Sequence, residues 1–208
     1  MPRLPLLLIA ALPTFLAAPA QAEPATAGPV ERLVLAHRLF ATGQAERDGL
    51  SQIAAARIAA SVALQTVERK PEVEGKGTPK AAAIPPDAAR MLEGAKAAVA
   101  ADETLGIFLT SAMASAEVLP KGSVRSSAAA LAPGQAHRYR LPADGGVKLD
   151  LGVVTDGLSQ LEIEAAAGDA VLCRARGYCG VTLVESGFVT VTLRNPGPED
   201  ENYLFLSN

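Results

Sequence analysis

The apolar positions follow two different periods along this chain. From about residue 30 to residue 119 they recur every three or four positions, which is typical of amphipathic helices. From about residue 134 they alternate with polar positions, which is typical of half-buried strands. The pattern predicts an α+β protein in which alanine-rich helical hairpins precede a small antiparallel β-sandwich.

Capping residues divide the first region into helices. We expect the first helix to start after Pro29 and end at Gly43. Its apolar stripe consists of Leu33, Ala36, His37, Phe40 and Ala41. Three aspartates are placed to cap the helices that follow, namely Asp48, Asp87 and Asp102. The second helix is expected to reach about Arg69.

Two segments lack an apolar period and mark boundaries. Residues 72–86 are rich in proline and glycine and predict a linker. Residues 123–134 hold mainly small residues and predict an exposed joint between the two regions. The expected organisation is therefore a helical module over 30–120, containing that linker, and a β-sandwich domain over 134–208.

Short alternating segments fill the second region. They are His137–Leu141, Val147–Leu151, Leu161–Glu164, Ala170–Arg174, Val181–Glu185, Phe188–Arg194 and Tyr203–Leu206. Glycine-containing pairs such as Asp156-Gly157 separate them as turns. Many short strands with no helix between them predict an antiparallel sandwich.

The first 22 residues have the layout of a cleavable signal peptide. Arg3 precedes an apolar stretch from Leu6 to Ala18, and Ala20-Gln21-Ala22 fits the small-residue cleavage pattern. A membrane anchor is the alternative, but that stretch is shorter than the roughly 20 residues needed to span a bilayer. We expect a periplasmic or secreted protein that begins at Glu23 and has no membrane span.

Composition argues against some classes of partner. The formal net charge is −3 and no basic cluster stands out, which argues against nucleic-acid binding. Tryptophan is absent and aromatic residues make up 4% of the chain, so little is available for a sugar-binding or single-strand-binding platform.

Cys173 and Cys179 are the two cysteines of the chain. A close pair in an exported protein predicts a structural disulfide. Free thiols and metal or redox chemistry are the alternatives, although the spacing fits neither a zinc knuckle nor a C-x-x-C motif. Gly177 can supply the positive φ that a tight connection between the cysteines requires.

The second region resembles the bacterial pre-peptidase C-terminal domain, a small secreted β-sandwich found beside many exported enzymes. The matching segments are His137–Pro142, Leu161–Glu164, Gly187–Val191 and Asn202–Leu204. Ser159 and Gln160 stand where the family carries acidic residues, so a calcium role does not transfer. The resemblance implies an accessory module with no reaction of its own, and the helical region resembles no family.

Two histidines are candidates for a catalytic role. His137 could meet Asp150 or Asp144 with Ser126 or Ser127 nearby, but no nucleophile elbow is present. His37 lies in an apolar stripe and is expected to be a partly buried structural histidine.

The acidic residues have similar alternatives. Glu162 and Glu164 could pair as in a glycosidase, but alternation explains them as the solvated face of a strand. The turn Glu199-Asp200-Glu201 leaves ion binding open. The sequence thus predicts no catalytic residue, cofactor or metal.

Two functions remain. The first is an exported, non-catalytic accessory or interaction protein of the bacterial envelope, with another envelope protein as partner. The second is an enzyme or small-ligand-binding protein whose site forms between the helical and sheet halves. A concave polar pocket there containing His37 or His137 would favour the second.

Overall fold

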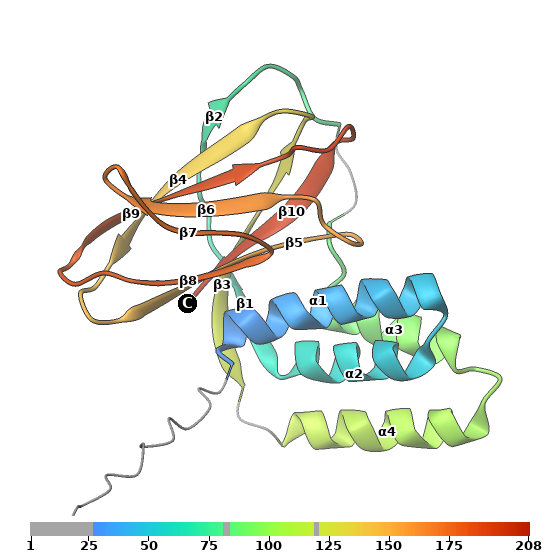
Figure 1. Ribbon diagram of the computed structural model, residues 1–208. Coiled ribbons are helices and arrows are strands. Elements are labelled where there is room, and N and C mark those ends of the chain that lie inside the picture. The colour runs from blue at the N-terminus through green and yellow to red at the C-terminus, as the bar shows by residue number, and fades with distance from the viewer. Residues whose placement is uncertain (1–26, 81–83, 119–120) are drawn as a thin grey trace, which may run out of the picture.

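A computed structural model describes residues 27–80, 84–118 and 121–208 of the chain (Figure 1). The expected signal peptide, residues 1–22, lies outside the described residues. A layer of helices lies against one side of a two-sheet sandwich (Figure 1). The α+β class, with the helices in the N-terminal region and most strands in the C-terminal region, is confirmed.

Four helices are described. They are α1 (Pro29–Glu46), α2 (Gly49–Ala60), α3 (Ala88–Ala98) and α4 (Glu103–Glu117). The three expected caps are confirmed, since Asp48, Asp87 and Asp102 each accept a hydrogen bond from a backbone N–H in the first turn of α2, α3 and α4 respectively. None of the described helices combines the length and the apolar character needed to cross a membrane.

The ends of the first two helices were predicted wrongly. α1 continues past Gly43, which is buried where α1 meets the start of α2. Arg47 instead ends α1, with a left-handed φ of 56°. α2 ends at Ala60, well before the expected Arg69, because the chain leaves the helical layer there and joins a sheet.

The strands form two five-stranded sheets. The strands are β1 (Val62–Thr66), β2 (Glu72–Glu74), β3 (Gly122–Leu131), β4 (Ala136–Ala143), β5 (Lys148–Thr155), β6 (Glu162–Ala167), β7 (Ala170–Arg176), β8 (Tyr178–Thr182), β9 (Gly187–Arg194) and β10 (Glu201–Ser207). Sheet A has the order β1-β3-β10-β5-β8, and sheet B has the order β2-β4-β9-β6-β7. The pairs are antiparallel except for β1 with β3.

Three strands lie where the sequence predicted something else. β1 occupies the expected end of a helix, β2 lies within the expected linker over 72–86, and β3 replaces the expected joint over 123–134. The expected strand Val181–Glu185 is also shifted, since β8 ends at Thr182. The division into modules over 30–120 and 134–208 stays a prediction, although strand pairs cross it.

The chain crosses between the sheets at both edges of the sandwich. At one edge it passes from β1 to β2, and Arg69 in this crossing donates to the carbonyl oxygen of Phe205 and to the hydroxyl of Ser207. At the other edge it passes from β7 to β8 through Gly177, whose φ is 87°. The expected disulfide between Cys173 and Cys179 spans this second crossing and joins sheet B to sheet A.

The interior of the sandwich holds a chain of hydrogen-bonded rings. Nδ1 of His137 lies 2.6 Å from the hydroxyl of Tyr203, which lies 2.6 Å from the hydroxyl of Tyr139. The ring of Tyr139 stacks on Phe205 with 4.7 Å between centroids. Since β4 belongs to sheet B and β10 to sheet A, this network links the facing sheets.

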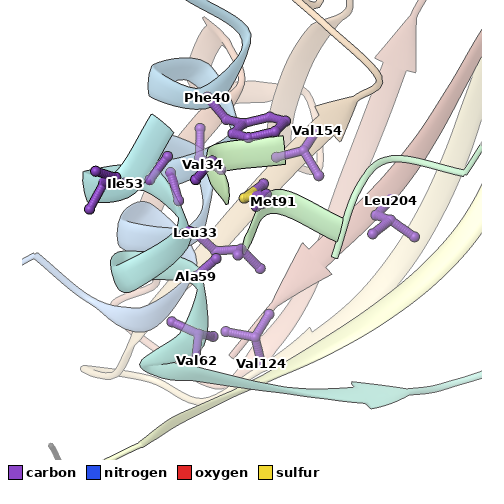
Figure 2. Packing of buried hydrophobic residues seen from close by; sticks show 14 of the residues in the cluster. Leu33, Val34, Phe40, Ile53, Ala59, Val62, Met91, Val124, Val154 and Leu204 are labelled. Atoms are coloured by element: carbon purple, nitrogen blue, oxygen red, sulfur yellow. The ribbon is translucent and has the colours of Figure 1, made fainter. Parts of the chain in front are cut away.

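A second core lies between the helices and the outer face of sheet A. α1 crosses β5, and Gly152 lets the two backbones approach closely beneath Val30 and Val34. Figure 2 shows side chains of the helices gathered with Val124, Val154 and Leu204 of sheet A. The helical layer therefore buries its apolar face on the sandwich. Each alanine side chain buries little area, so the helices by themselves would have only a small core.

The disulfide should contribute to stability. Replacing both Cys173 and Cys179 with alanine frees a short loop in the unfolded chain, for which loop-closure entropy predicts a loss of about 2 to 3 kcal/mol. Urea denaturation should show this loss with the fold retained by circular dichroism. Reduced wild-type protein should unfold at the variant's urea midpoint, and equal stability of the variant and the oxidised wild type would contradict the prediction.

The close approach of α1 to β5 can be tested with two glycines. An alanine Cβ at Gly152 would lie 2.9 Å from methyl groups of Val30 and Val34, so Gly152→Ala should cost about 1 to 3 kcal/mol. Gly106→Ala in α4 meets no atom within 4 Å and should instead stabilise by roughly 0.5 to 1 kcal/mol. Thermal denaturation of the two variants should therefore shift in opposite directions.

Candidate binding pocket between helix α1 and sheet A

A pocket of about 400 Å³ lies where α1 meets the end of β5. Its walls come from one face of α1, the last residues of β5, the turn that follows β5, and the connection from β7 to β8. The lining residues are Val34, His37, Arg38, Val153, Val154, Thr155, Gly157, Leu158, Ser159, Arg176 and Gly177. The helical and sheet regions thus share one concave site.

The histidine of this pocket is uncharged at neutral pH. Val34, His37 and Arg38 are spaced three and four residues apart, so α1 places them on one face. His37 is 6% exposed, and its Nδ1 has no hydrogen-bond partner in the described structure. Burial lowers the pKa of His37 to about 4, because water cannot stabilise the charged ring.

The positively charged side chain of Arg38 lies at the edge of the pocket. The guanidinium of Arg38 donates a 2.8 Å hydrogen bond from Nη2 to the carbonyl oxygen of Arg176. It lies against Gly177, where a Cβ would come within 2.7 Å of the same nitrogen. A guanidinium has five N–H donors and stays protonated, so this bond leaves donors for a ligand.

The turn after β5 forms the opposite wall. Gly157 has a φ of 111°, which reverses the chain so that Leu158 and Ser159 reach the pocket. Leu158 is 56% exposed, and the Ser159 hydroxyl accepts a 3.0 Å hydrogen bond from the backbone N–H of Leu161. This wall contributes an apolar side chain and a hydroxyl that is already used as an acceptor.

The sequence offered residues for a serine-histidine-acid site but predicted no such site, and the structure does not assemble one around His137. The ring of His137 is hydrogen-bonded to the hydroxyl of Tyr203. Asp150 accepts a 2.6 Å hydrogen bond from the hydroxyl of Tyr178 and forms an ion pair with Lys148 at 3.0 Å. Ser126 and Ser127 are buried in β3. Burial also lowers the pKa of His137.

The candidate glutamates of β6 lie on the face of the strand away from the core of the sandwich. Glu162 and Glu164 flank buried Ile163 on β6, as the alternation predicted, and Arg174 on the adjacent strand forms an ion pair with Glu164. This arrangement places the two glutamates on the outer face of sheet B.

The acidic turn at 199–201 anchors a distant part of the chain. A carboxylate oxygen of Asp200 accepts a 3.0 Å hydrogen bond from the backbone N–H of Lys80, and the carbonyl of Glu199 accepts one from Asn195. Within the described ranges, no group of three or more histidine, cysteine, aspartate or glutamate side chains could hold a metal ion.

Sequence reasoning singled out one residue of the pocket and missed the others. His37 was weighed as a structural histidine, and it is indeed buried on the inner face of α1. Arg38 and Thr155 were not predicted as site residues, and Ser159 was named only as standing where the resembled family carries an acidic residue. The Asp156-Gly157 turn was recognised, but nothing in the sequence indicated that α1 would lie beside it.

Comparisons with known proteins show no close relative. No protein-family profile matches the chain, and no curated protein matches it. The periplasmic inhibitor of g-type lysozyme from Aeromonas hydrophila, PliG, is 14% identical with a TM-score of 0.36, covering 41% of this chain and 84% of that one. A de novo designed double-stranded β-helix is 15% identical with a TM-score of 0.28, covering 40% of this chain and 99% of that one.

These likenesses are too weak to transfer a function. The sandwich expected from the resemblance to the pre-peptidase C-terminal domain is present as a two-sheet β fold. Membership in that family has no support from the family comparison. The candidate pocket therefore has to be interpreted from its own residues.

The buried state of His37 predicts a pH-dependent stability. The ring gains a proton near pH 6.5 in the unfolded chain but only near pH 4 in the folded one. The free energy of unfolding should therefore fall as pH drops through this range, by up to about 3 kcal/mol from this residue. Denaturation of wild type and His37→Gln at pH 7 and pH 4 should show the smaller change in the variant, and equal changes would contradict the prediction.

Proposed function

We propose that this protein is an exported, non-catalytic binding protein of the bacterial envelope, and that its binding site is the pocket between α1 and sheet A. The observation that carries the proposal is the pocket itself, into which a buried histidine contributes a polar ring whose Nδ1 has no partner. Ligand sites in proteins combine mostly apolar walls with a few polar groups, and this pocket has that makeup.

The state of the polar groups favours binding over catalysis. A general base works best with a pKa near the pH of the reaction, whereas burial holds the pKa of His37 near 4. In a catalytic triad the second ring nitrogen would bond to an acid, yet Nδ1 of His37 has no partner among the described residues.

A protein partner is the second candidate function. An apolar groove of about 310 Å³ runs between α2 and α4 and is lined in part by Ile53, Ile58 and Phe108. Phe108 is 56% exposed, and its neighbour Ile107 is 68% exposed. Large exposed apolar side chains beside a groove favour contact with another protein. Under this alternative, the partner is another envelope protein.

Two matched variants separate these functions. His37→Phe keeps an aromatic ring but removes the polar ring atoms of His37 from the pocket, and Phe108→Ala removes the large ring from the groove. ¹⁵N-labelled protein should be titrated separately with the small-molecule fraction and with the protein fraction of a periplasmic extract, and the small-molecule fraction should shift amide signals of residues 153–159. The shifts should be lost in His37→Phe and kept in Phe108→Ala. Shifts confined to α2 and α4, or none, would contradict the proposed site.

A further inference from the structure

The charged residues that line the pocket, Arg38 and Arg176, are both positive. Arg38 brings a positive charge to the rim, and its guanidinium is held by the carbonyl of Arg176 and fits against Gly177. Among the residues that the structure describes, none of those lining the pocket is an aspartate or glutamate, and Asp156 lies in the adjacent turn without lining the pocket. A guanidinium with no carboxylate beside it in the pocket favours an anion, which it can bind through several donors.

The remainder of the pocket is mainly uncharged. Val34 and Val154 belong to the apolar core between helices and sheet, and Leu158 forms part of the opposite wall. The imidazole of His37 adds a polar but neutral ring. A fully charged, strongly hydrated anion would lose its water here without enough compensating groups. The walls instead suit a ligand with an apolar body.

His37 contributes a second polar group to the pocket, independently of Arg38. This side chain is only 6% exposed and lines the pocket, and its Nδ1 has no partner in the described structure. Buried N–H groups without a partner are rarer in proteins than buried acceptors without one, so the ring proton belongs on Nε2. The ring can then offer that N–H to a ligand oxygen.

We propose that the pocket binds small amphipathic anions, with the apolar body of the ligand against Val34, Val154 and Leu158 and its anionic head group at Arg38. This inference rests on the proposed function, because it specifies the class of ligand for the same pocket. Aliphatic carboxylates are the simplest members of this class.

Three ligands with the same chain and different head groups test the proposal. Octanoate, octanol and octylammonium should be titrated into the full-length mature protein at neutral pH, with isothermal calorimetry for affinity and ¹⁵N amide shifts for location. Octanoate should bind with a dissociation constant at least about tenfold below that of octanol, and its shifts should map to α1 and residues 153–159. Octylammonium should show no saturable binding.

Variants of exposed arginines provide the matched control. Arg38→Gln should weaken octanoate binding about tenfold and bring it close to octanol, whereas Arg38→Lys should retain part of the preference. Arg90 on α3 also donates a hydrogen bond to a backbone carbonyl, that of Ile84, so Arg90→Gln should leave binding unchanged. Circular dichroism should show that each variant is folded.

The outcomes distinguish this inference from the proposed function. Equal binding of octanoate and octanol at residues 153–159 would overturn the anion preference while leaving the pocket as a binding site. Binding that maps to the groove at Phe108, or no saturable octanoate binding, would overturn the ligand class. The proposed function would fail separately if the periplasmic extract also gave no shift at the pocket.

Discussion

The packing of helix α1 across strand β5 is the contact on which the rest of this structure depends. Gly152 permits it, since any larger residue would meet Val30 and Val34. Among the remaining helices, α2 packs against α1. Helices α3 and α4 in turn pack against α2. Alanine-rich helices bury little area per residue, so the apolar outer face of sheet A completes their core.

The pocket is a product of this same contact. α1 and the turn after β5 line the pocket together with the end of β5, so the pocket lies where the helix meets that strand. The disulfide braces the neighbouring wall, because Cys173 and Cys179 bracket the connection that supplies Arg176 and Gly177. The guanidinium of Arg38 therefore rests on a part of the chain that is held covalently between two strands.

Sequence patterns predicted the helix caps and strands, which are determined by residues close together in the chain. Capping aspartates such as Asp48 and the alternating strands of the second region were found because their signals lie within a few residues. β3 was missed because its serines and alanines have little preference for strands, and its pairing with β1 and β10 outweighs that. The pocket could not be predicted, since it joins segments that only the packing of α1 on β5 brings together.

The sharing of strands between the two regions constrains how the chain can fold. β1 pairs with β3 and β2 pairs with β4, so residues far apart in sequence must meet before either sheet is complete. During synthesis the helices emerge first, yet the surface that covers them, including Leu204 and Leu206, comes last. Contacts of such large sequence separation slow folding. A chain truncated before β10 would lack the strand that joins β3 to β5 in sheet A, so the sheet that covers the helices could not form and apolar surface would stay exposed to chaperones and proteases.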